Sequence, residues 1–275
     1  MSTYNLDDSF SSSSKEIESI EFLQDDLEEI RGSNYSNISE IYIFIHGIRS
    51  SSSSFDGCRE VVQSHLIDAG INKKVELVVV RYERISAFRA LFCKNFSKAE
   101  NFVSCQITNI IEKYTNEKLK VNIIAHSFGS RIFSRICGDL NTHFEKIIFL
   151  GSVSRDSLSV SVEKSCNIFL NICGARDYIV LLAYILRGNF YSYNGYFGFR
   201  TGTIIDAFYE ANHGMLIDKE FFRLHIIPII LKDSIIKSNG RKRIKETSVI
   251  NIRRFLIILV FAALPLILIM FLLWE

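Results

Sequence analysis

The cysteines of this sequence lack the spacing of a metal site or a redox motif. Six occur, at positions 58, 93, 105, 137, 166 and 173, with no CxxC pair and no histidine at metal-ligand spacing. No apolar run with a cleavage site follows Met1, so we expect no secretory signal peptide. Both absences indicate reduced thiols and a domain on the cytoplasmic side.

The chain also has little overall charge of either sign. Its formal net charge is +2, which argues against a nucleic-acid partner. The charge is divided between the ends: residues 1–31 carry nine acidic and two basic side chains, and residues 232–254 carry eight basic and two acidic ones. We expect a Ser-rich acidic arm over 1–37, with a short amphipathic helix over 15–31, and a basic juxtamembrane segment over 232–254.

The long uncharged run of the chain lies at its C-terminal end. Residues 255–274 are 20 positions without a charged side chain, long enough as a helix to span about 30 Å, the thickness of a bilayer's hydrocarbon core. Pro265 is tolerated in a bilayer, and Trp274 stands where an interfacial aromatic belongs. A buried core helix is the alternative. We predict a single-pass C-terminal anchor, with the basic segment and the globular domain on the cytoplasmic side and Glu275 on the far side.

Between these ends no internal repeat is present, and residues 38–231 have the length of one domain. Continuous β-branched and aromatic runs predict buried strands over 41–45, 75–80, 121–125, 147–150 and 167–172. Helix-length segments over 55–69, 97–114 and 127–136 separate some of them. This alternation predicts an α/β fold with a mostly parallel sheet covered by helices on both faces. Residues 186–203, rich in Gly, Tyr and Phe, predict a loop that either covers a substrate or packs on the surface.

A serine stands between one of these strands and the helix that follows. In Ala125-His126-Ser127-Phe128-Gly129 the positions two before and two after the serine are small. A sharp strand-to-helix turn needs small residues there, and it pushes the hydroxyl outward at the helix N-terminus. The pentapeptide is weak evidence alone, and an ordinary helix N-cap is the alternative interpretation of Ser127.

With this setting, residues 40–225 resemble the α/β-hydrolase superfamily of esterases and lipases. The pentapeptide is similar to its G-x-S-x-G nucleophile elbow, with Ala125 in place of the first glycine. His46-Gly47 follows the first strand, where the superfamily has its oxyanion loop. The resemblance implies that the backbone N–H groups of Ile48 and Phe128 form the oxyanion hole, supported by His46, Gly47 and Gly129. The segment before residue 41 is too short and acidic for the early antiparallel strands of many members, so we expect roughly six strands.

The resemblance also assigns the other members of a triad. Asp177 stands in a turn after the 167–172 strand, and His213 stands beside Gly214 in a loop, giving the order Ser, Asp, His. Asp156, which follows the 147–150 strand, is the rival acid. Asp206 and Asp218 are interpreted as solvated charges or helix caps.

The resulting prediction is a membrane-anchored serine hydrolase that acts through an acyl-enzyme on carboxylic esters or thioesters, without a metal or an organic cofactor. Anchorage favours a lipid or acyl substrate in the bilayer, although a soluble ester or peptide fits the residues equally. A non-catalytic interaction module and a membrane-damaging effector are the alternatives from other classes.

Overall fold

The computed structural model describes residues 37–256, except for 49–51, 73, 84, 87–88, 91–94, 115–117, 189, 200–202, 233–244 and 246–247. The predicted acidic arm and its helix over 15–31 therefore lie outside the described residues, apart from Asn37. The same holds for the predicted span over 255–274 beyond its first two residues, and for most of the basic segment over 232–254. Among the helices that are described, none is both long and apolar enough to cross a bilayer.

The described chain forms one sheet of six parallel strands, in the order β2-β1-β3-β4-β5-β6. The strands are β1 (Glu40–Ile45), β2 (Val75–Val80), β3 (Lys120–His126), β4 (Phe144–Leu150), β5 (Cys166–Gly174) and β6 (Ile205–Tyr209). This confirms the predicted α/β class, the parallel sheet and the number of strands. The five predicted strands correspond to β1 to β5, whereas β6 has no counterpart among the predicted strands.

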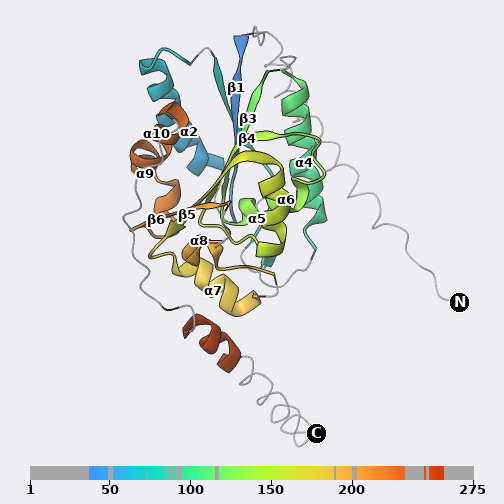
Figure 1. Cartoon of the computed structure of the whole chain (residues 1–275), viewed down its shortest axis with the longest axis vertical. Coiled ribbons are helices and arrows are strands. Elements are labelled where there is room, and N and C mark those ends of the chain that lie inside the picture. The colour runs from blue at the N-terminus through green and yellow to red at the C-terminus, as the bar shows by residue number, and fades with distance from the viewer. Residues whose placement is uncertain are drawn as a thin grey trace, which may run out of the picture. The chain divides into compact units, whose positions relative to one another are not determined.

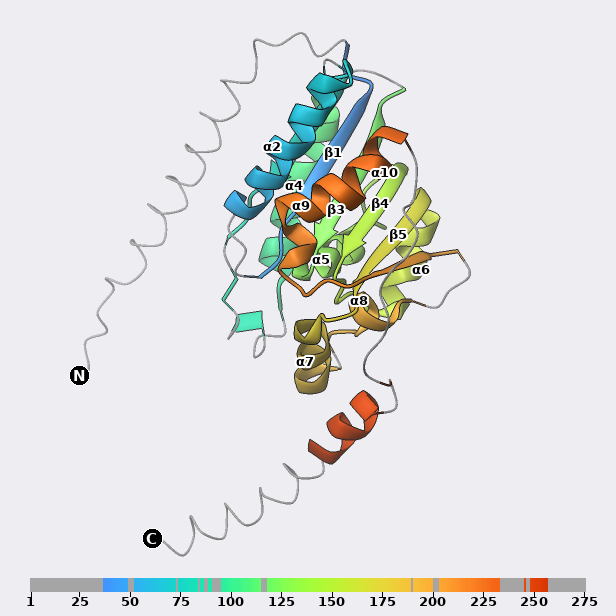
Figure 2. The same ribbon diagram turned by 90° about the vertical axis from the view of Figure 1, so that its left-hand side faces the viewer.

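Helices cover both faces of the sheet (Figures 1 and 2). They are α2 (Ser52–Asp68), α4 (Ser97–Glu112), α5 (Phe128–Ile136), α6 (Asp156–Lys164), α7 (Tyr178–Arg187), α8 (Asn194–Phe197), α9 (Lys219–Phe221) and α10 (Ile227–Lys232), with a 3₁₀ turn at Met215–Ile217 and a π-helical turn at Phe222–Ile226. Helices α2, α9 and α10 lie on one face, and α4, α5 and α6 on the other. The predicted loop over 186–203 contains α8.

Aromatic side chains fill the two layers between sheet and helices. On the face of α2 the rings of Phe44, Phe55 and Phe222 pack with centroids 5.6 and 6.3 Å apart. On the face of α5 the ring of Phe133 packs edge-on against Phe144, at 5.3 Å. Alternate residues of each strand enter opposite layers, so strands buried on both faces are apolar throughout.

The strand register brings five loops to one edge of the sheet. Ile45 of β1 pairs with Ala125 of β3, and His126 pairs with Leu150 of β4. At the far side of the sheet Gly174 of β5 pairs with Tyr209 of β6. Because all strands run in the same direction, the residues that follow them emerge side by side, and this is where an open α/β sheet places its ligands.

Candidate active site

Ser127 occupies a strained turn between β3 and α5. Its backbone φ of 52° and ψ of −119° make it the one non-glycine residue with positive φ in the described part of the chain. Such a conformation costs about 1–3 kcal/mol and persists where the surrounding structure imposes it. Here Gly129 permits it, because a Cβ at that position would lie 2.4 Å from the carbonyl oxygen of Ile45 and 2.6 Å from that of His46.

The side chain of Ser127 does not act as a helix cap. Ser127 stands at the N-cap position of α5, yet its hydroxyl makes no capping hydrogen bond. By contrast, Asp177 and Asp218 cap α7 and α9 and accept hydrogen bonds from the backbone N–H groups of Val180 and Glu220. The hydroxyl of Ser127 is therefore left available at the edge of the sheet, and Asp218 fulfils its predicted role as a cap.

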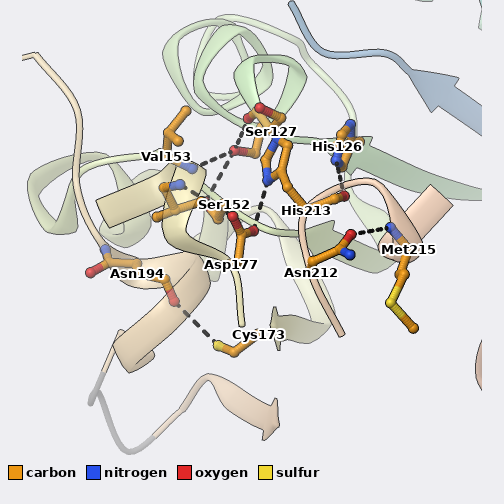
Figure 3. Close-up of polar contacts among 12 residues, drawn as sticks. His126, Ser127, Ser152, Val153, Cys173, Asp177, Asn194, Asn212, His213 and Met215 are labelled. Carbon is orange, nitrogen blue, oxygen red and sulfur yellow. Dashed lines mark hydrogen bonds and ion pairs between the residues drawn. The ribbon is translucent and has the colours of Figure 1, made fainter. Parts of the chain in front are cut away.

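The structure brings Asp177 and His213 into direct contact. The Nδ1 atom of His213 lies 2.7 Å from Oδ2 of Asp177, whose side chain is fully buried. The second carboxylate oxygen accepts the N–H of Val180 at 3.2 Å. Figure 3 shows the ring of His213 between Asp177 and Ser127. Because Nδ1–H donates to a carboxylate, the lone pair of the neutral ring is on Nε2, where a general base needs it.

Gly151, which directly follows β4, is a site residue that the sequence analysis missed. It has a φ of +56°, and an added Cβ would lie 2.8 Å from Oδ2 of Asp177 and 3.1 Å from Nδ1 of His213. A side chain there would enter the space of the Asp-His pair. The available signal was a glycine immediately after a buried strand, at the same edge as the serine.

His46 and Gly47 lie beside the serine. A Cβ on Gly47 would be only 2.8 Å from Cβ of Ser127, so this loop passes against the turn. Tyr82 holds the loop: its ring stacks on that of His46 at 4.0 Å and 3°, and its hydroxyl donates to the His46 carbonyl at 2.5 Å. Burial lowers the pKa of His46. Ile48 follows in a bend and is partly buried.

His126 contacts the loop that carries His213. Its Nε2 donates to the carbonyl oxygen of His213 at 3.3 Å, and the two rings pack with centroids 4.6 Å apart. Burial, and then the neighbouring His213, hold the pKa of His126 well below its usual value. The ring is therefore neutral, and it adds no positive charge beside His213.

The other candidate acids have different partners. Asp156, the rival acid, accepts a hydrogen bond from Nδ2 of Asn194 at 2.6 Å. Asp206 is partly buried in β6 rather than at a helix start, and it accepts hydrogen bonds from Nδ2 of Asn171 at 2.7 Å and from the N–H of Phe199 at 3.2 Å. Asn171 is fully buried on β5, and its amide needs such an acceptor.

Within the described residues, no three His, Cys, Asp or Glu side chains are arranged to hold a metal ion. The cysteines that the structure describes, at positions 58, 105, 137, 166 and 173, are free thiols. Burial raises the pKa of Cys58 to about 12 and that of Cys137 to about 11, so neither is a ready thiolate.

No protein-family model matches this chain, and no curated protein matches it in sequence. Solved structures do resemble it. A predicted CIB-like hydrolase from Thermoplasma acidophilum is 15% identical, covering 72% of this chain and 88% of its own, with a TM-score of 0.45. An esterase from Pyrococcus furiosus is 12% identical, with 69% and 79% covered and a TM-score of 0.44. An uncharacterized protein from Bacillus cereus is 10% identical, with 82% and 71% covered and a TM-score of 0.47.

Proposed function

We propose that this chain is a membrane-anchored serine hydrolase that cleaves carboxylic ester or thioester bonds. Ser127 is the nucleophile, His213 the general base and acid, and Asp177 the residue that orients the histidine. The observation that carries the proposal is the 2.7 Å contact between Asp177 and His213 next to Ser127, whose backbone is strained and whose hydroxyl makes no capping hydrogen bond. Asp177 is preferred to Asp156 because Asp156 contacts Asn194 instead.

The reaction follows from these positions. As Oγ of Ser127 attacks the carbonyl carbon, Nε2 of His213 takes its proton, and the buried carboxylate of Asp177 stabilises the imidazolium. The N–H groups of Ile48 and Phe128 stabilise the oxyanion, a contribution of about 3–4 kcal/mol for each well-placed donor. His213 then protonates the leaving alkoxide or thiolate as the tetrahedral intermediate collapses to the acyl-enzyme. Water, deprotonated by His213, releases the acid and restores Ser127.

The membrane part of the proposal comes from the sequence. The uncharged run over 255–274 and the arginines directly before it favour a single-pass anchor with the hydrolase domain on the cytoplasmic side. A tethered enzyme meets lipids and acylated proteins at high local concentration. Lipid or acyl esters are therefore the favoured substrates.

The test is labelling of the detergent-solubilised full chain with a fluorophosphonate probe. We expect wild type to be labelled, Ser127→Ala to be unlabelled, and His213→Ala and Asp177→Ala to be labelled slower by about a hundredfold or more. Asp156→Ala is the matched control and should label at close to the wild-type rate. A folded, accessible wild-type chain that stays unlabelled would favour the interaction module. Toxicity on overexpression that survives Ser127→Ala would favour the membrane-damaging effector.

A further inference from the structure

Helix α7 exposes apolar side chains on its outer face. Four are about half exposed, at 48, 58, 54 and 50%: Tyr178, Ile179, Leu182 and Leu186. Ile179, Leu182 and Leu186 share one side of the helix because they recur at i, i+3 and i+7. Val180 and Leu181 on the inner side are buried. A helix with apolar side chains on both sides is typical of one whose outer face contacts another molecule or a membrane.

The last described helix, over residues 248–256, extends this surface. It packs against α7: the guanidinium of Arg253 lies 5.2 Å from the ring centroid of Tyr184, and a Cβ on Gly188 would be 2.5 Å from Nε of Arg253. Both views show this helix next to α7 (Figures 1 and 2). Its exposed apolar side chains are Ile252, Phe255 and Leu256. We call α7 and residues 248–256 together the docking face.

The charges of the docking face are all of one sign. Neither 178–187 nor 248–256 contains an acidic residue, whereas Arg187, Arg253 and Arg254 lie within them. Apolar side chains with arginines among them match the boundary between acyl chains and anionic headgroups.

We propose that the docking face lies on the surface of a lipid bilayer that carries anionic headgroups. The chain itself indicates this occupant: beyond Leu256, the last residue that the structure describes, residues 257–274 of the sequence carry no charge. An anchor that begins there holds the docking face within one helix length of the bilayer. The inference rests on the anchorage proposed above, and it is independent of the chemistry at Ser127.

Docking through α7 orients the candidate active site. Asp177 is the N-cap of α7, so the Asp-His pair begins where the docking face ends. The C-terminal end of the sheet, where Ser127 lies, is then held next to the headgroups, so that the ester bonds of the lipids are at high local concentration beside it. The docking face therefore favours ester substrates that are embedded in the membrane.

The first experiment places a fluorescent label on one cysteine of the full chain, reconstituted in vesicles of phosphatidylcholine and phosphatidylserine with doxyl-labelled lipid as quencher. Ile179→Cys and Leu182→Cys are compared with Ile67→Cys, all in a Cys93→Ser, Cys105→Ser, Cys166→Ser background, which leaves only buried cysteines besides the introduced one. Ile67 is equally exposed, at 55%, but it lies in the last turn of α2, on the side of the domain where the strands begin and away from Ser127. We expect quenching several-fold stronger at 179 and 182. Equal quenching at the three positions, or labels at 179 shielded by a second copy in a concentration-dependent manner, would overturn the proposal.

The second experiment compares hydrolysis of a vesicle-embedded ester with that of a short soluble ester. In Ile179→Glu/Leu182→Glu the ratio of the two rates should fall by about tenfold, because two apolar contacts with lipid are replaced by charges that anionic headgroups repel. Ile67→Glu should keep the wild-type ratio, and an unchanged ratio in the α7 variant would refute the docking face. If the chain has no hydrolase activity, quenching still decides the docking face, so the two proposals fail separately.

Discussion

Single residues at the edge of the sheet decide whether Asp177 and His213 can meet. The bond between them has a length of 2.7 Å and lies directly against the bare Cα of Gly151. The side chain of Asp177 is fully buried, and its other oxygen accepts the N–H of Val180. The carboxylate therefore cannot move away from Gly151 without losing this hydrogen bond. A methyl group added at Gly151 would therefore displace the Asp177 carboxylate or the His213 ring from their contact.

The first prediction at this scale is that Gly151→Ala removes activity without unfolding the chain. Alanine at a positive φ costs about 1–2 kcal/mol of stability wherever it occurs. Gly70 is the matched control, since its φ is +71° and an added Cβ would meet nothing within 4 Å. In thermal melts Gly151→Ala should lose more stability than Gly70→Ala, by about 1–3 kcal/mol, because its methyl group also overpacks the buried pair, and Gly151→Ala alone should lose fluorophosphonate labelling while it remains folded. Equal labelling of the two would show that the Asp-His pair tolerates the added methyl group.

At the scale of elements, a buried hydrogen-bond network ties the first turn of α5 to the end of β4. Oγ of Ser130 donates to the carbonyl oxygen of Ser127 at 2.6 Å and accepts the N–H of Val153 at 3.3 Å. It also lies 3.0 Å from Oγ of Ser152. The side chain of Ser130, in the first turn of α5, thus stabilises the strained backbone of Ser127 through its carbonyl oxygen.

Ser130→Ala should therefore lower both stability and activity. The buried N–H of Val153 loses its acceptor, at a cost of about 1–3 kcal/mol. Ser64→Ala removes the same type of bond, from Oγ to the carbonyl three residues earlier, at 2.9 Å on the exposed side of α2. It should change stability by about 0.5 kcal/mol or less. Denaturant unfolding with parallel ester hydrolysis checks both, and a Ser130→Ala chain that matches Ser64→Ala in both measurements would rule out a supporting role for this network.

The elements differ in how far the sequence predicted them. Strands β1, β3 and β4, inside the sheet, are buried over nearly their whole length, and each contains a run of apolar residues that is visible without any tertiary information. Strand β6, at the edge of the sheet, has the mixed sequence IDAFY and alternates in burial. A run that short gives no clear periodicity, and only pairing with β5 makes it a strand.

At the scale of the whole molecule, the fold holds two histidines neutral in its interior. Burial lowers the pKa of His46 and of His126. In the unfolded chain each titrates near its usual value of about 6.5. Below that pH the unfolded state binds protons that the folded state does not, so stability falls as pH falls.

We therefore predict that the melting temperature of the full chain in detergent, followed by circular dichroism, is lower at pH 5.5 than at pH 7.5. Each histidine contributes a slope of up to about 1.4 kcal/mol per pH unit below pH 6.5, and little above it. His126→Gln, whose amide can still donate to the His213 carbonyl, should reduce the difference between the two temperatures. A wild-type chain that melts at the same temperature at both pH values would contradict this account.

By itself the sequence determined what depends on neighbours along the chain. The apolar runs specify the central strands, because burial on both faces requires them, and the small residues around Ser127 specify a tight turn between strand and helix. The family resemblance built on these patterns assigned an acid after the 167–172 strand and a histidine in a later loop, but it left Asp156 open beside Asp177.

Only the tertiary structure decided which of these groups meet. Strand register brings the loops after β5 and β6 together, so that Asp177 contacts His213 while Asp156 contacts Asn194. It also places Gly151 and His126 against that pair. These contacts join residues from different strands, and their existence depends on the order and alignment of six strands. No local pattern encodes that alignment, because each strand alone is compatible with several neighbours.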